Sequence, residues 1–270
     1  MRTAAALGLT TILLTSACSG PASQQPTPTP PPTTPAATTP TAITPTIGPT
    51  PSPIASPTPA PTRPPASVEP ANFVAAVTNQ WFPLKPGQRR IYRGVKDGKP
   101  AYEVFVVTSE TKTILGVTCV VVRDTLNLDG KLAEQTDDWY AQDKAGNVWY
   151  FGEKTATYKP SGAIESRDGS FQAGVDGAQA GIYMTATPQL GVDYQQEYYK
   201  GQAEDHFVAT DLSVPVKVPY GSFPHALRTK EFTPLEPGVI DHKYYVSGVG
   251  VVKEASEDGD ERLDLVSFQH

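Results

Sequence analysis

The sequence predicts an all-β domain, mainly antiparallel, in which a single curved meander sheet forms a half-barrel, a closed barrel or a sandwich, with one short N-terminal helix. The first observation is a succession of segments after residue 87 that are rich in β-branched and aromatic residues. The second is the short turns between them, such as Asp129-Gly130, because Asp-Gly is typical of tight hairpins. Sequential strands joined by short turns pair with their neighbours, and this gives a meander.

The chain begins with the signature of export and lipid anchoring. Arg2 gives a positive start, residues 4–14 form a mainly apolar run, and the small residues 15–17 precede Cys18. This segment resembles the signal peptide and lipobox of bacterial lipoproteins, in which cleavage before the cysteine is followed by its acylation. A spanning helix needs about 20 apolar residues, and this run is shorter. We predict a lipoprotein signal peptide over residues 1–17 and a lipidated Cys18; an ordinary secretory signal is the alternative.

Residues 18–70 have the composition of a tether. Of the 28 prolines in the chain, 18 lie between Pro21 and Pro70, and most of the other residues there are Thr, Ala and Ser. Such a segment cannot bury enough apolar surface to offset its ordering entropy. It is therefore expected to be a disordered, extended linker between the anchor and one β domain over residues 71–270.

The predicted domain begins with a short helix over residues 69–79, since Phe73, Val74 and Val77 are spaced along one face after a proline. An aromatic turn over residues 81–87 follows. About ten strands are then expected. Their predicted ranges are residues 88–95, 100–110, 117–128, 131–142, 148–152, 194–199, 204–218, 226–232, 240–248 and 262–268.

Residues 158–190 interrupt this pattern with a long segment rich in Gly, Ala, Asp and Ser. A loop of this length inside a compact domain is usually functional or mobile. We therefore predict that residues 169–183 cover an open face of the sheet.

Several motifs in the β domain carry a family resemblance. Residues 79–87 match the pattern N-x-[YW]-F-P-L-x-P-G, and residues 141–153 match A-Q-D-x-x-G-N-V-W-Y-F-G-E. With residues 173–178, 194–205 and 244–250, they resemble a family of secreted or lipid-anchored bacterial proteins of the actinobacterial type whose activity is not known. The resemblance to half-barrel β lipoproteins is more distant. It implies a curved sheet and an envelope location, and it implies no chemistry.

The net charge of the domain and the spacing of its His and Cys residues limit the classes of ligand that we expect. From residue 71 onward the chain has 20 basic and 27 acidic residues, a net charge of −7, with no basic cluster. Nucleic acid is therefore not expected as a partner. The four histidines are scattered, and Cys119 lies in a β-branched run, so no metal site and no cofactor are predicted, and Cys119 is expected to be buried and inert.

Aromatic residues supply the first candidate site. They occur in adjacent pairs along the predicted strands, so that one member of each pair faces the core and the other faces outward. Outward rings on neighbouring strands suit stacking against a sugar or an apolar ligand. The residues proposed to bind such a ligand are Trp149, Tyr183, Tyr194 and Tyr198; simple covering of the sheet surface is the alternative.

Acidic residues supply the second candidate site. Asp137, Glu153, Glu197 and Glu204 lie near turns and could act as acid and base in a glycoside-type hydrolysis. Solvated turn carboxylates are the simpler interpretation. Asp137 and its neighbour Asp138 are expected on opposite faces of a strand.

These observations together predict a surface lipoprotein of the cell envelope. It would be held on the outer face of the cytoplasmic membrane, or on the outer membrane of a diderm, through its acyl anchor. Its β domain is predicted to bind an apolar or glycan ligand, or another envelope protein, without catalysis. The alternative is a carboxylate-dependent hydrolase of the cell envelope, and the two differ in whether carboxylates converge at the base of a cleft.

Overall fold

The structure is a computed structural model that describes residues 68–270. The predicted signal peptide, Cys18 and nearly all of the predicted tether lie outside the described residues. Within residues 68–270, no helix is long and apolar enough to cross a membrane.

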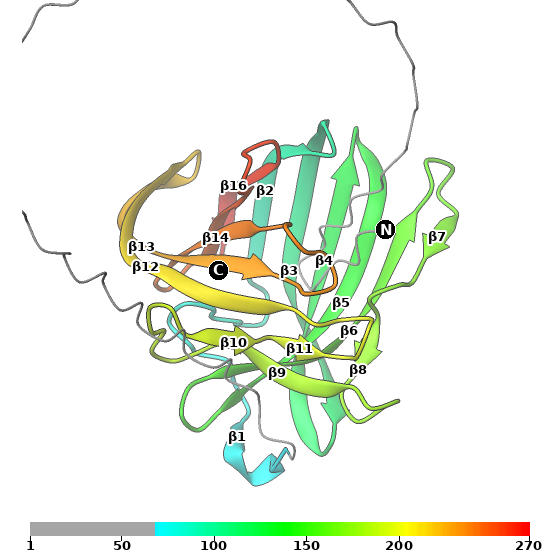
Figure 1. Cartoon of the computed structure of the whole chain (residues 1–270), viewed down its shortest axis with the longest axis vertical. Coiled ribbons are helices and arrows are strands. Elements are labelled where there is room, and N and C mark those ends of the chain that lie inside the picture. The colour runs from blue at the N-terminus through cyan, green and yellow to red at the C-terminus, as the bar shows by residue number, and fades with distance from the viewer. Residues whose placement is uncertain (1–67) are drawn as a thin grey trace, which may run out of the picture. The chain divides into compact units, whose positions relative to one another are not determined.

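The domain is built almost entirely from antiparallel strands (Figure 1). The strands are β1 (Phe73–Val74), β2 (Arg89–Lys96), β3 (Lys99–Ile114), β4 (Val117–Leu128), β5 (Lys131–Asp143), β6 (Val148–Tyr158), β7 (Ile164–Ser166), β8 (Phe171–Gln172), β9 (Gln179–Met184), β10 (Asp193–Gln195), β11 (Glu197–Tyr198), β12 (His206–Val218), β13 (Gly221–Phe232), β14 (Asp241–Val246), β15 (Gly250–Ser256) and β16 (Arg262–Gln269). The all-β, antiparallel prediction is confirmed.

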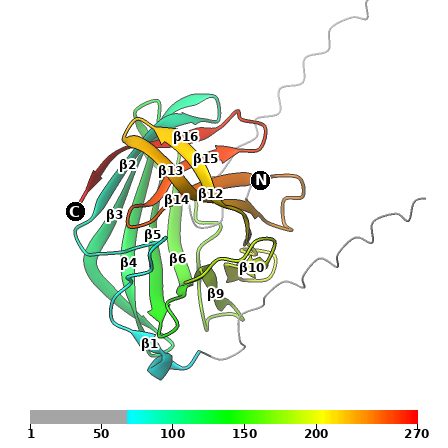
Figure 2. The same ribbon diagram turned by 90° about the vertical axis from the view of Figure 1, so that its left-hand side faces the viewer.

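The strands form one nearly closed, barrel-shaped sheet. Its order is β10-β12-β13-β14-β15-β16-β2-β3-β4-β5-β6-β9-β11, with β1 on β5 and with β7 and β8 on β6. Figures 1 and 2 show β2–β6 as one curved wall with β12–β14 across the interior from it. Because β10 and β11 end the sheet on either side and only Gln196 separates them in the chain, this short segment closes the barrel. We call residues 193–198 the seam.

Two Asp-Gly turns form hairpins where the sequence predicts them. Asp97-Gly98 and Asp129-Gly130 join β2 to β3 and β4 to β5, and all four residues have positive φ between 51° and 72°. That backbone conformation favours Gly and tolerates Asp. The predicted range of β4 agrees with the structure at both ends, whereas β15 was not predicted.

The predicted N-terminal helix is much shorter in the structure. A single 3₁₀ turn covers Pro70–Asn72, and the chain then becomes extended and pairs with β5 as β1. The helix over residues 69–79 is therefore wrong beyond Asn72. The Phe73 ring packs on the outer face of the sheet, where its centroid lies 5.6 Å from that of Trp149 and 5.4 Å from that of Phe151.

The glycine-rich segment is also corrected by the structure. Phe171–Gln172 and Gln179–Met184 are strands β8 and β9, and both pair with β6. The residues between them form a turn closed by a 2.9 Å hydrogen bond from the Gly174 amide to the Ala178 carbonyl. The segment is therefore part of the wall of the barrel and does not cover an open face.

Candidate functional site

The interior of the barrel has an aromatic part. Phe82 enters from the segment before β2, and its ring lies 5.2 Å from that of Tyr140 and 4.5 Å from that of Tyr183. Tyr140 in turn lies 4.9 Å from Tyr150. These four side chains are at most 1% exposed, so this part is a closely packed core.

The rest of the interior is lined by acids. Side chains alternate across a strand, and the inward positions of β5 read Glu134, Thr136, Asp138 and Tyr140, all of them buried. The same alternation on other strands adds further carboxyls. The eight buried interior carboxyls are Glu103, Asp124, Glu134, Asp138, Glu153, Glu197, Glu231 and Glu254. Two buried lysines, Lys96 and Lys243, accompany them.

Asp138 and Glu153 share one phenol. The Tyr150 hydroxyl lies 2.7 Å from Asp138 Oδ1 and 3.0 Å from Glu153 Oε2, yet it has a single hydrogen to donate. Burial raises the pKa of Asp138 to about 7, although the bond from Tyr150 acts in the opposite direction. Burial and the charge of Asp138 raise the pKa of Glu153 well above its usual range. The pair is therefore suited to holding a proton at neutral pH.

Lys243 forms a buried ion pair on the other side of the interior. Its ammonium contacts Glu231 Oε2 and lies 4.0 Å from Glu254 Oε2. The Tyr245 hydroxyl donates to Glu231 Oε1 at 3.0 Å. Burial outweighs the nearby ammonium at Glu254 and raises the pKa of that carboxyl to about 8. Lys243 therefore pairs with Glu231, while Glu254 is suited to holding a proton at neutral pH.

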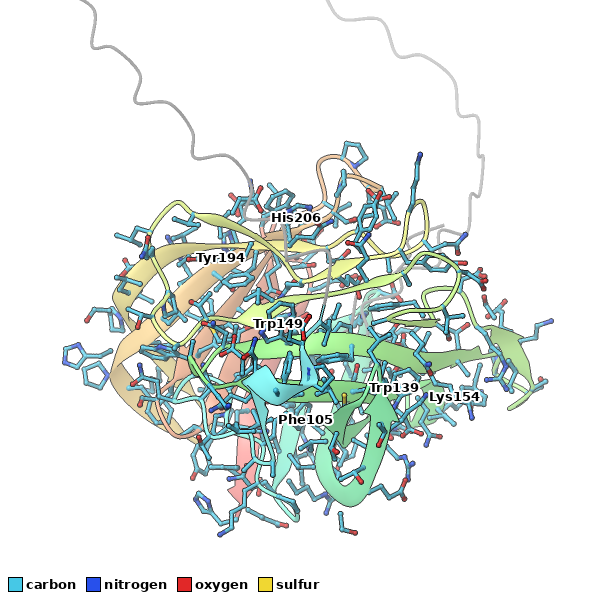
Figure 3. All side chains as sticks on the ribbon, turned by 90° about the horizontal axis from the view of Figure 1, so that it is seen from below. Phe105, Trp139, Trp149, Lys154, Tyr194 and His206 are labelled. Carbon is cyan, nitrogen blue, oxygen red and sulfur yellow. The ribbon has the colours of Figure 1, made fainter. Side chains whose placement is uncertain are left out.

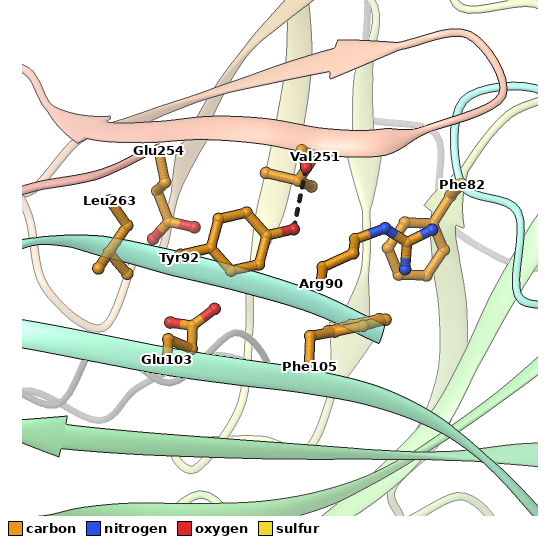
Figure 4. A pocket seen from close by; sticks show the side chains of 8 residues that line it. All are labelled: Phe82, Arg90, Tyr92, Glu103, Phe105, Val251, Glu254 and Leu263. Carbon is orange, nitrogen blue, oxygen red and sulfur yellow. Dashed lines mark hydrogen bonds between the residues drawn. The ribbon is translucent and has the colours of Figure 1, made fainter. Parts of the chain in front are cut away.

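Glu103 and Tyr92 are among the residues that line a small cavity between β2, β3 and β15 (Figure 4). The Tyr92 hydroxyl donates to the Val251 carbonyl at 2.9 Å. Burial raises the pKa of Glu103 to about 7. The volume open to the centre of a water molecule is about 10 Å³ here, and it is also about 10 Å³ in a second cavity beside Asp124 and Glu134. Each is room for about one water.

Glu197, in the seam, is a buried acid without hydrogen-bond partners, as is Asp124 among residues 68–270. Glu197 is 1% exposed, and neither of its carboxyl oxygens has a hydrogen-bond partner among residues 68–270. Burial, followed by the charges of Asp205, Glu153 and Asp138, raises the pKa of Glu197 well above its usual range. The nearby Lys243 lowers it. A buried carboxyl without partners is stable only when it is protonated.

A wider hollow lies outside the barrel. It measures about 650 Å³ and is formed by the β2–β3 turn, the loop before β14 and the β15–β16 turn. We call it the turn groove. Its acidic lining residues are Asp97, Asp241, Glu257, Asp258, Asp260 and Glu261. Within residues 68–270, no three or more His, Cys, Asp or Glu side chains are arranged to hold a metal ion.

The four aromatic candidates lie in different surroundings. Trp149 belongs to an outer cluster with Trp139 and Phe151 under residues 68–73, whereas Tyr183 is inside the barrel. Tyr194, which belongs to the seam, stacks on the Phe207 ring at 4.9 Å, and Figure 3 shows it apart from Trp149. Tyr198 is half-buried. The structure does not bring these rings together in one concavity.

The four acidic candidates divide into two pairs. Glu153 and Glu197 are both interior and close enough to affect each other's ionisation. Asp137 faces outward and pairs with Arg123 at 2.7 Å, and Glu204 accepts the Gly201 amide in a turn at 2.7 Å. The expectation of solvated carboxylates is therefore wrong for Glu153 and Glu197. Asp138 and Glu134 belong with them and were not singled out in the sequence as site residues.

No protein-family model and no curated protein matches the chain. Two solved structures resemble it. One is a protein thought to be exported, with a YmcC-like fold, from Bacteroides fragilis NCTC 9343; it is 14% identical, with 71% of this chain and 100% of that chain covered and a TM-score of 0.40. The other is a protein thought to be a lipoprotein from Parabacteroides distasonis ATCC 8503; it is 12% identical, covers 71% and 99% of the two chains, and has a TM-score of 0.37. At these scores neither likeness bears on function.

Proposed function

We propose that this chain is a lipid-anchored protein of the cell envelope whose β domain binds an envelope partner on its outer surface, without catalysis. One observation supports the outer surface above all. The interior described by residues 68–270 is packed with side chains, and the two cavities found in it have room for about one water each. Pockets that bind small molecules measure roughly 300–1,000 Å³.

An apolar ligand inside the barrel is the less supported form of binding. An acyl chain there would have to displace packed aromatic rings or lie against Glu103, Glu153 and Glu197, which are buried acids. Carboxyl groups separated from both water and partners are costly. The geometry therefore favours the envelope partner over the apolar ligand.

The turn groove is the proposed place of contact. It is a hollow of about 650 Å³, and six acidic residues line it. Because the domain also carries net negative charge, the groove suits a positively charged partner, such as a basic protein segment or an amine-bearing polymer of the envelope.

The hydrolase alternative has part of its geometry. Glu153, Glu197 and Asp138 converge and have raised pKa values, as acid–base catalysts often have. The two interior cavities described in residues 68–270 have room for about one water each, and none of these three acids lines either of them. Convergence without a cleft supports binding over hydrolysis.

Photo-crosslinking in cells tests this proposal. A benzophenone amino acid replaces Asp258 in the turn groove, and as a matched control it replaces the exposed Lys144 in the β5–β6 turn. We expect a discrete adduct from position 258 that weakens at high salt, and none from position 144. Equal adducts from both positions, or a stoichiometric lipid in addition to covalent acyl groups in native mass spectra, would contradict the proposal.

A further inference from the structure

The seam is held to its neighbours by short ladders, like the joins of β6 with β9 and of β15 with β16, which each have three residue pairs. β10 pairs with β12 over three residues, and β11 pairs with β9 over two. In contrast, β2 and β3 pair over eight residues. The two ends of the sheet are joined by Gln196, whose amide donates to the Asp205 carbonyl at 2.7 Å. Few hydrogen bonds between paired strands therefore have to break for the wall to open at the seam.

The seam is also closely packed against β9. A Cβ built on Gly181 would lie 2.2 Å from the Gln196 carbonyl oxygen. Only glycine permits this approach of the two backbones. The contact is backbone on backbone, so it adds little apolar burial to the few ladder pairs.

Glu197 in the seam lies within electrostatic reach of other buried acids. The charges of Asp205, Glu153 and Asp138 oppose its ionisation, and that of Lys243 favours it. That cation is already paired with Glu231 and lies near Glu254. The phenol of Tyr150 supplies one hydrogen to the Asp138 and Glu153 pair. Closure therefore depends on protons held by these carboxyls.

From this juxtaposition we propose that the seam is a proton-controlled opening, closed while the acids beneath it hold protons and parted when they release them. This device is separate from the proposed partner binding at the turn groove. Ionisation places like charges side by side in a medium of low dielectric constant, where repulsion is strong. The wall yields at the seam because fewer residue pairs hold it there than along the wall of β2 and β3.

The direction of the pH response follows from burial. The pKa of Asp138 is raised to about 7, and the pKa values of Glu153, Glu197 and Asp205 are raised by burial as well. Because these acids bind protons more tightly when they are buried in the closed form, low pH favours the closed form. The opening equilibrium constant should rise by about tenfold per pH unit for each proton released.

Hydrogen exchange on the full-length protein tests the proposal. Exchange is measured at about pH 5.5 and about pH 8.5 and corrected for the intrinsic effect of pH on amide exchange. We expect peptides from residues 179–184 and 193–208 to lose protection at the higher pH by about tenfold or more. Peptides from β3 and β4 should change by less than about twofold, because the opening is local. Equal loss in all strands, or no loss at the seam, would overturn the proposal.

The variant Glu197→Gln tests whether the pH response of the seam depends on the ionisation of Glu197. The amide keeps the size of the side chain and cannot ionise, so the seam of this variant should stay protected at the higher pH. Glu204→Gln is the matched control, because Glu204 lies in the adjacent turn and accepts the Gly201 amide; it should respond like the unmodified protein. If Glu197→Gln does not fold, Glu153→Gln is measured in the same way. An unchanged response in a folded variant refutes the role of these acids.

Discussion

The buried acids predict an unusual dependence of stability on pH. Asp138, Glu103 and Glu254 are buried, and their pKa values are raised to about 7, about 7 and about 8. In the unfolded chain, carboxyls ionise near pH 4. The folded protein therefore binds more protons than the unfolded chain between about pH 5 and pH 7. The stabilisation from these protons is complete below the unfolded pKa and is lost as the pH rises through the folded pKa.

The magnitude can be worked for one carboxyl. Asp138 changes from a usual pKa of 3.8 to about 7. While it alone retains its proton, the free energy of unfolding falls by about 1.4 kcal/mol per pH unit. Between pH 5 and pH 7 this amounts to about 3 kcal/mol. Since domains are typically stable by about 5–15 kcal/mol, one such group produces an easily measured change.

Urea unfolding at a series of pH values measures this change. Tryptophan fluorescence follows unfolding, and the free energy of unfolding is obtained at about pH 5, 6, 7 and 8. We expect the protein to be at least about 3 kcal/mol less stable at pH 7 than at pH 5. A stability that is constant or increases over this range would refute the assignment of protonated acids to the interior.

A matched pair of variants assigns the effect to the interior. Asp138→Asn removes an ionisable group beside Tyr150 and should reduce the slope of stability against pH. Asp137→Asn removes the neighbouring carboxyl, which faces outward toward Arg123, and should leave the slope unchanged. Equal slopes in the two variants would contradict the alternation of faces on which the interior is built.

Three further predictions concern other parts of the molecule. Lys243→Met removes the ammonium that contacts Glu231, and should lower the free energy of unfolding by about 3–5 kcal/mol at neutral pH, measured in urea. Gly94→Ala places a Cβ 1.6 Å from the Arg262 carbonyl oxygen, so thermal melting should show a strongly destabilised or unfolded protein; an unchanged melting temperature would contradict the β2–β16 pairing. Cys18→Ser should abolish labelling by a fatty-acid probe, because Cys18 is the predicted lipidation site; equal labelling would exclude it.

Local features of the fold could be predicted from the sequence because local chemistry determines them. Asp129-Gly130 requires positive φ, and the structure has it, so the hairpin between β4 and β5 follows from two residues. The pairing of β16 with β2 joins residues 262–269 to residues 89–95. No turn encodes a contact over that distance, so the sequence left open whether the sheet forms a half-barrel, a barrel or a sandwich.

The acidic interior is not predicted from the sequence, because polar side chains on a strand usually indicate the face that is exposed to solvent. On β5, residues 134–138 are all polar, so no alternation with apolar residues marks the face that is buried. In the structure Glu134, Thr136 and Asp138 face inward, and Trp139 on the opposite face is covered by other parts of the chain. The adjacent pair Trp139-Tyr140 was the available signal, since two neighbouring aromatic residues on one strand indicate that both faces are buried.

The place of β16 in the sheet bears on the biogenesis of the protein. β16 pairs with β15 on one side and with β2 on the other, so it connects the arm formed by β2–β6 with the arm formed by β12–β15. The ribosome synthesises residues 262–269 after every other strand of the sheet. Until then the two arms cannot join through their ladder, and the chain stays without its closed core. The closed core of the domain can therefore form only after residues 262–269 have been synthesised.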